Sequence, residues 1–166
     1  MRILVVYDSV LGNTQFVARP VGEAFRSPAD VAVIRVTDVR PEQLARLKIL
    51  MVGSPARGFK PPQAIADFLK RIPTHGIKGV QVAAFETQLP TSDIESSALR
   101  LLVRTGGYAA KSMVDRLEKK GGELLLPPEE SMVEGGKGPL KEGELERAVV
   151  SAKRMTESRE LGSRPW

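Results

Sequence analysis

Short apolar runs alternate along this chain with segments whose apolar residues recur at helical spacing. The apolar runs span residues 3–7, 31–36, 49–52, 80–85 and 123–126. They show little of the in-out alternation of a half-exposed strand, as expected when helices cover both faces of a sheet. The sequence therefore predicts an α/β fold: a three-layer, doubly wound, five-stranded parallel sheet.

The segments between these runs predict the covering helices. Apolar residues recur at i, i+3, i+4 and i+7 in three of them, and we expect these positions to face the core: Ile65, Phe68, Leu69 and Ile72; Ala110, Met113, Val114 and Leu117; Leu145, Ala148, Val149 and Ala152. Pro62 suits the first turn of one helix, and Gly121-Gly122 suits the end of another. The first expected helix, 14–25, contains Pro20, which costs about 3 kcal/mol or forces a kink.

The length of 166 residues suits one domain, expected over residues 1–157, followed by a polar and mobile tail over 158–166. No apolar run approaches the ~18–20 residues that cross a bilayer, and no signal-peptide core is seen. We therefore expect a cytoplasmic protein without membrane insertion.

Composition excludes several kinds of chemistry. The chain has no cysteine and one histidine, which excludes disulfides, protein-ligated iron–sulfur clusters, thiol catalysis and a His-rich metal site. Any redox chemistry would need a bound cofactor. The formal charge is +5, but the basic residues are spread along the chain, so we expect a solvated surface and no nucleic-acid partner.

Polar and small residues follow the first strand, where an open parallel sheet binds its ligands. The segment 8–14 carries hydroxyls at Ser9 and Thr14 around a turn that enters a helix. Two interpretations fit: the backbone N–H groups of the turn hold an anion at the helix N-terminus, or Asn13 or Thr14 is simply an N-cap.

This segment resembles the phosphate loop of flavodoxins, in which Ser/Thr-x-Thr-Gly-Asn-Thr holds the FMN phosphate. Three further stretches resemble flavodoxins: Gly53-Ser54-Pro55, Phe85-Glu86-Thr87-Gln88 and the entry to the last helix at 138–146. The resemblance extends from Arg2 to about Met155. It implies a flavodoxin-like fold, FMN as cofactor, and cofactor contacts from Ser9, Val10, Leu11, Gly12, Asn13, Thr14, Pro55, Ala56, Arg57, Gly58, Phe59, Glu86, Thr87 and Gln88.

The sequence departs from the flavodoxin pattern in three respects. Leu11 replaces a hydroxyl residue of the phosphate loop. The second and third loops lack Trp and Tyr, so Phe59 is the aromatic available in the second loop. The chain is basic, whereas classical flavodoxins are strongly acidic, which predicts a redox partner with an acidic surface.

These features give three functional hypotheses, none with a catalytic or metal-ligating residue. The first is an FMN-binding electron-transfer protein, in which the resemblance gives Gly58 a peptide that flips when the flavin is reduced. The second is an FMN-dependent NAD(P)H:quinone or flavin oxidoreductase, with Arg57 and Lys60 facing a dinucleotide phosphate. The third is a flavin-free binding module. No oligomeric state is predicted.

Four other features bear on a possible site. His75 lies before the fourth strand and is interpreted as a surface loop residue, whereas Glu86 is either near the flavin ring or a solvated or capping carboxylate. Residues 135–138 are a second anion cradle or, preferably, a connection. Residues 94–103 have helical spacing and either pack on the core, the favoured interpretation, or cover the flavin.

A response-regulator receiver, which shares this architecture, is rejected as an alternative, because Gly53-Ser54 stand where its acceptor aspartate would be.

Overall fold

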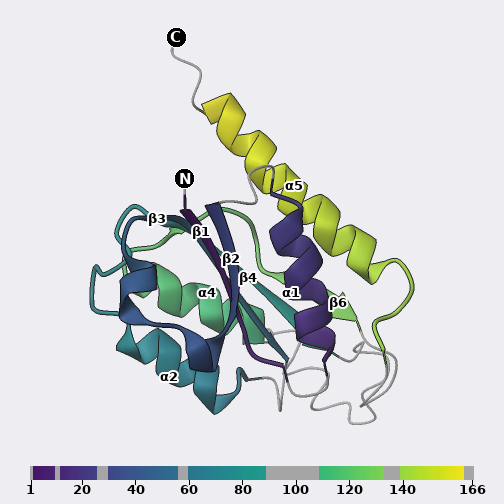
Figure 1. Cartoon of the computed structure of the whole chain (residues 1–166), viewed down its shortest axis with the longest axis horizontal. Helices are drawn as coiled ribbons and strands as arrows, with labels where there is room; N and C mark the ends of the chain where they lie inside the picture. The colour runs from purple at the N-terminus through teal and green to yellow at the C-terminus, as the bar shows by residue number, and fades with distance from the viewer. Residues whose placement is uncertain are drawn as a thin grey trace.

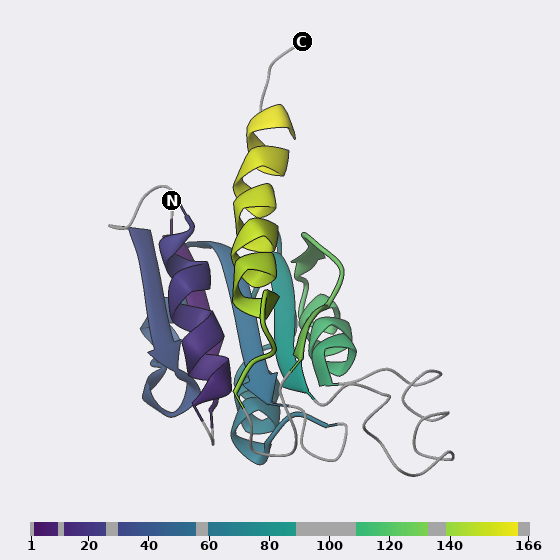
Figure 2. The same cartoon turned by 90° about the vertical axis from the view of Figure 1, so that its right-hand side faces the viewer.

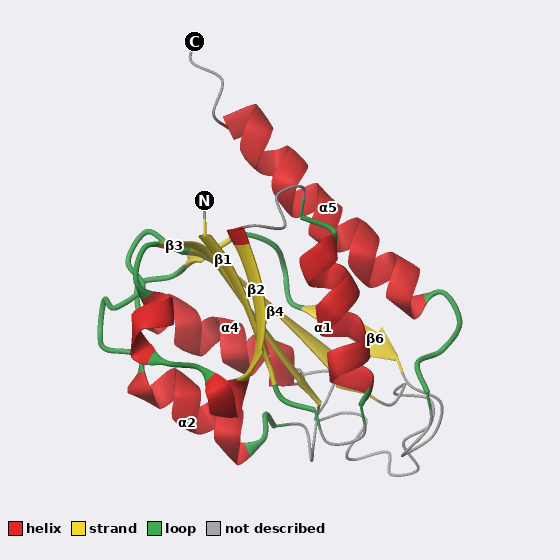
Figure 3. Ribbon diagram, in the orientation of Figure 1, coloured by secondary structure: helices red, strands yellow, loops and turns green. Residues whose placement is uncertain are grey.

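The computed structural model describes residues 2–9, 12–25, 30–55, 60–88, 109–132 and 139–162. These residues form a parallel sheet between two layers of helices, as predicted (Figure 1, Figure 3). The strands are β1 (Arg2–Tyr7), β2 (Val31–Arg35), β3 (Leu47–Pro55), β4 (Gln81–Gln88), β5 (Glu123–Leu124) and β6 (Glu129–Met132). The helices are α1 (Asn13–Glu23), α2 (Gln63–Arg71), α4 (Ala109–Lys119) and α5 (Glu144–Gly162), with 3-10 turns η2 (Val36–Asp38) and η3 (Pro41–Leu44).

The sheet has the strand order β2-β1-β3-β4-β5, and all its pairs are parallel. The predicted fifth strand is present in two segments: β5 pairs with the start of β4, and β6 pairs with its end. Pro127 and Pro128 lie between these segments. Proline cannot donate a hydrogen bond to the neighbouring strand. The strand expected over 123–126 therefore ends at Leu124, and pairing with β4 resumes at Glu129.

Two apolar clusters fill the spaces between sheet and helices. One cluster packs α2 and α4 against one face of the sheet, and the other packs α1 and α5 against the opposite face (Figure 1, Figure 2). The predicted core positions of α2 and α4 are buried, whereas on α5 Ala152 is buried and Leu145, Ala148 and Val149 are half-buried. The helical spacing therefore identified the core faces correctly.

Helix α1 continues through Pro20. Proline has no N–H for the carbonyl of Phe16, yet Val17, Ala18 and Val21 are buried against the sheet and hold this segment in place. The predicted span 14–25 was too long by two residues at its C-terminal end. Pro62 was also misplaced by a residue, since it is the N-cap of α2 and its carbonyl accepts the Ala66 N–H at 3.0 Å.

The ends of α4 and α5 complete the fold. Gly121, at φ 97°, ends α4: its N–H donates to Glu118 O at 2.9 Å, and the Gly122 N–H donates to Leu117 O at 3.0 Å. This is the left-handed glycine end that the Gly pair predicts. Helix α5 extends beyond the sheet (Figure 2) and reaches Gly162, so the boundary expected at Ser158 falls inside it. Across the described ranges, no helix is long and apolar enough to span a membrane.

Candidate functional site

Buried polar residues gather at the edge of the sheet where β1, β3 and β4 end. Five polar or charged residues are buried among those described: Asp8, Thr14, Ser54, Glu86 and Thr87. All of them lie at the carboxyl ends of these three strands or in the first turn of α1. The strand order reverses direction between β1 and β3, and such a point is where open parallel sheets bind ligands. Burying polar groups costs free energy unless they are hydrogen-bonded, so their partners show what this edge is built for.

The loop between β1 and α1 directs backbone N–H groups toward one oxygen. The Ser9 Oγ accepts the Gly12 N–H at 3.1 Å and the Gln15 N–H at 3.4 Å. Gly12 adopts φ 91°, which favours glycine, and a Cβ there would meet no described atom within 4 Å. The N-cap of α1 is Gly12, so the interpretation of Asn13 or Thr14 as N-cap was wrong. Ser9 supplies the capping oxygen from outside the helix instead.

A buried pair of hydroxyls joins this loop to β4. Thr14 Oγ1 and Thr87 Oγ1 are 3.0 Å apart, and the two residues are 1% and 6% exposed. Two hydroxyls carry two protons, and the bond between them uses one, so the pair retains a proton that it can donate. Ser9 Oγ is likewise the acceptor in both of its hydrogen bonds, so the hydroxyl proton of Ser9 is available to donate.

Asp8 and Arg35 fix the start of the loop. The Asp8 N–H donates to Gly53 O at 3.0 Å, and Asp8 Oδ1 accepts the Ser9 N–H at 2.9 Å. Arg35 Nη2 lies 3.5 Å from the Asp8 carboxylate and donates to Ser9 O at 3.2 Å. Sequence reasoning assigned no role to either residue. Arg35 reaches this loop because it is the last residue of β2 and pairs in register with Tyr7 of β1.

Gly53 allows an aromatic ring to lie across the sheet at this edge. It pairs with Tyr7 on β1 and with Phe85 on β4. A Cβ on Gly53 would overlap the Phe85 ring, so no larger residue fits without a shift. Ser54 is fully buried, and its Oγ donates to Pro55 O at 2.9 Å. The Gly-Ser-Pro stretch therefore ends β3 inside the packed sheet.

Glu86 is a buried capping carboxylate. Its Oε2 accepts the Ala110 N–H at 2.6 Å, in the first turn of α4, where a negative charge complements the helix dipole. The capping interpretation is confirmed, and the solvated one was wrong.

Pro55, Glu86, Thr87 and Gln88 were expected in loops but lie in strands. β3 and β4 stay paired through Ser54–Glu86 and Pro55–Thr87, which carries the strands beyond the predicted ends at residues 52 and 85. At this edge the structure thus brings together Ser9, Gly12, Asn13 and Thr14 with Pro55 and Thr87.

Several predicted residues lie outside the described part of the chain: Val10, Leu11, Ala56, Arg57, Gly58 and Phe59, together with the segments 94–103 and 135–138. His75 lies in the exposed turn between α2 and β4, at the opposite edge of the sheet, as predicted. Within the described ranges, no group of three or more His, Asp or Glu residues could hold a metal ion.

Several known structures superpose on nearly the whole chain. A flavodoxin from the domain Archaea superposes with a TM-score of 0.74 at 20% identity, covering 96% of this chain and 99% of that one. This protein has a flavodoxin-like fold. Oxidised flavodoxin 1 from Bacillus cereus shares the flavodoxin-like fold with a TM-score of 0.73 at 14% identity, over 95% of this chain and 98% of that one.

The flavodoxin-like fold also occurs as part of a longer chain. Rubredoxin oxygen:oxidoreductase from Desulfovibrio gigas matches with a TM-score of 0.71 at 17% identity, over 96% of this chain but 36% of that one. No protein-family model matches this sequence, and a search of curated proteins finds no match. These likenesses establish the fold, and the function depends on the chemistry of the site residues.

Proposed function

We propose that this protein binds FMN at the carboxyl edge of its sheet and transfers electrons between partner proteins. The observation that carries the proposal is the convergence of the Gly12 and Gln15 N–H groups on one oxygen, Ser9 Oγ, at the start of α1. N–H groups that meet at one acceptor can also meet at a phosphate oxygen. The likeness to flavodoxins supports FMN as the ligand that supplies this phosphate.

The donors present at this edge suit a phosphate. The first turn of α1 adds the partial positive charge of a helix N-terminus. The hydroxyls of Ser9 and of the Thr14–Thr87 pair each have a proton to donate. When FMN binds, we expect Ser9 to turn its hydroxyl toward the phosphate, which frees the N–H groups of Gly12 and Gln15 for the same anion.

The ends of β3 and β4 would border the ring of the bound flavin. Pro55 ends β3 and pairs with Thr87 near the end of β4, and residues 56–59 come next in the sequence after Pro55. The Glu86 carboxylate is bonded to α4, so we assign only the Glu86 backbone to the flavin side. When bound, FMN supplies the electron-transfer chemistry, and the protein sets its orientation and surroundings.

We further propose that the redox partner has an acidic surface, because this chain has a formal charge of +5. Complementary charge mainly raises the association rate, and salt screens it. The rate of electron transfer to an acidic partner should therefore fall as ionic strength rises. A rate that does not depend on salt would reject this part of the proposal.

FMN binding is tested by titrating the flavin-free protein with FMN and following the quenching of flavin fluorescence. Saturable binding at micromolar FMN supports the proposal, and no binding would leave a flavin-free binding module. Thr74→Ala is a suitable control, because it removes an exposed hydroxyl in the turn between α2 and β4, at the opposite edge of the sheet. Steady-state oxidation of NADH or NADPH with a quinone as acceptor is the second measurement. A rate at or above ~1 s⁻¹ would identify the protein as an NAD(P)H oxidoreductase and would contradict the electron-carrier assignment.

A further inference from the structure

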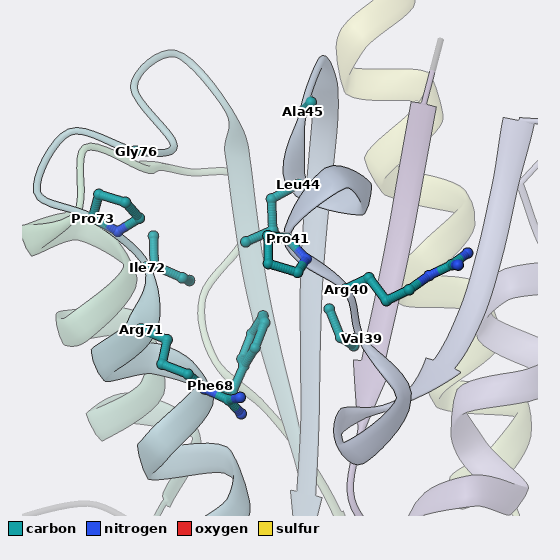
Figure 4. Close-up of a pocket in the computed structure, with 10 residues that line it drawn as sticks. All are labelled: Val39, Arg40, Pro41, Leu44, Ala45, Phe68, Arg71, Ile72, Pro73 and Gly76. Carbon is teal, nitrogen blue, oxygen red and sulfur yellow. The ribbon is translucent and has the colours of Figure 1, made fainter.

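A cavity of about 360 Å³ opens near the edge of the sheet opposite the proposed FMN site. It lies between η3, the C-terminal end of α2 and the turn that follows α2 (Figure 4). Its apolar walls come from Val39, Pro41, Leu44, Phe68, Ile72 and Pro73. Small-molecule sites usually have volumes of ~300–1,000 Å³ and mostly apolar walls, so this cavity has the size of a binding site.

The cavity exists because the connection between β2 and β3 contains no full helix. Parallel strands are usually joined through an α-helix that covers the sheet. Here the connection has two short 3-10 turns, η2 with three residues and η3 with four. Val39 and Leu44 are partly buried against the core cluster of α2 and α4. The short turns therefore leave an apolar depression beside α2 that a longer helix would fill.

The charged groups of the cavity are all positive. Arg40 and Arg71 line it, and no carboxylate does. Both arginines are exposed, and in the described part of the chain neither has a carboxylate within ion-pair distance. Arg71 lies on the α2 side of the cavity, whereas Arg40 extends away from it (Figure 4). His75 and Lys78 follow in the adjacent exposed turn.

We propose that this cavity binds a small amphipathic anion, namely a medium-length alkyl carboxylate. The alkyl chain would lie among the apolar walls, and the carboxylate would pair with Arg71 at the rim. Arg40, whose exposed side chain is free to change rotamer, would add a second, weaker interaction. The proposal concerns a different edge of the sheet and is independent of FMN binding.

The test is a titration of ¹⁵N-labelled protein with sodium decanoate, followed by amide chemical shifts. We expect saturable shifts at Ala45, Ile72 and Gly76, which line the cavity. Octanoate should bind about 15-fold more weakly, as expected for the loss of two buried methylenes. Absence of saturable shifts at these residues, or affinity independent of chain length, would overturn the proposal.

Matched variants test the role of charge. Arg71→Gln should weaken decanoate binding about fivefold, the upper range for an exposed ion pair, and Arg40→Gln should weaken it less. Arg154→Gln changes the net charge equally, but Arg154 is exposed on α5 across the sheet, so its affinity should equal the parent's. Equal weakening in Arg71→Gln and Arg154→Gln, or equal affinity for 1-decanol, would overturn the anion specificity. FMN affinity should be unchanged in all three variants.

Discussion

The two edges of the sheet consist of the same strands but differ in the chemistry of their side chains. At the carboxyl edge, five polar or charged residues are buried among those described, and Thr14, Glu86 and Thr87 are joined to other elements or chain segments by hydrogen bonds. At the amino edge, the depression beside α2 has apolar walls and exposed arginines at its rim. Burying a polar group costs free energy unless the group is hydrogen-bonded. The carboxyl edge therefore depends on particular hydrogen bonds, whereas the amino edge needs only apolar packing.

Helix direction explains part of this difference. In a parallel α/β sheet the helices begin at the carboxyl edge, where their free N–H groups attract negative charge. The Glu86 carboxylate at the start of α4 satisfies one such group. The helices end at the amino edge, where their C-termini favour cations, and the last turns of α2 and α4 carry Lys70, Arg71, Arg116 and Lys119. The two edges should therefore respond differently to substitution.

The largest effect is expected at Gly53. Gly53→Ala forces a Cβ into the Phe85 ring and should lower the free energy of unfolding by about 3 kcal/mol. Gly12→Ala meets no described atom within 4 Å but keeps φ 91°, so it should cost only ~1–2 kcal/mol. Urea unfolding of both variants measures this difference. Similar losses would mean that the Phe85 ring moves aside readily.

The next effect concerns FMN. Ser9→Ala and Thr14→Ala should each weaken FMN binding by about 1.5–3 kcal/mol, or roughly 12- to 150-fold, because each removes a hydroxyl that donates to a charged group. Thr14→Ala should also reduce stability by about 1 kcal/mol, because it breaks the bond to Thr87. Fluorescence titration beside the control Thr74→Ala gives the comparison. If both variants bind FMN like the parent, the phosphate is held elsewhere, and residues 135–138 are the next candidates.

A similar but purely structural effect is expected at Glu86. Glu86→Ala leaves the Ala110 N–H without this carboxylate and should lower stability by about 2 kcal/mol. Glu86→Gln keeps an acceptor oxygen and should lose less. Hydrogen exchange of the Ala110 amide reports the local change. Glu42→Ala, an exposed site on η3 near the other edge, should alter stability by no more than ~0.5 kcal/mol. Equal losses at Glu86 and Glu42 would contradict the contrast between the edges.

The smallest effect is expected at Leu11. Leu11→Thr restores the residue type that flavodoxins favour in this loop, so FMN affinity should be unchanged or slightly higher. The change is measured by the same fluorescence titration, with Val150→Thr on the exposed side of α5 as the control. Weaker binding by Leu11→Thr alone would show that an apolar residue is needed at this position.

The fold was largely predictable because hydrophobic periodicity is a local property. The spacing of Ile65, Phe68 and Leu69 shows which side of α2 faces the core, whatever lies opposite. The turn that enters α1 was predictable for a similar reason, because the Gly12 and Gln15 N–H groups both donate to Ser9 Oγ within a short segment. Strand ends were less predictable, since β3 and β4 continue only because each pairs with the other.

The contacts that complete the site were decided by the tertiary structure. Thr14 and Thr87 are 73 residues apart, and Glu86 meets Ala110 from 24 residues away. Neither pair leaves a periodic signal, because each depends on the strand order and on the register of β1, β3 and β4. The apolar cavity is likewise set by how η3 and α2 meet. The sequence alone determined which helix faces turn toward the core and where the turn into α1 lies, whereas packing between distant segments determined which polar groups are buried at this edge and which of them meet.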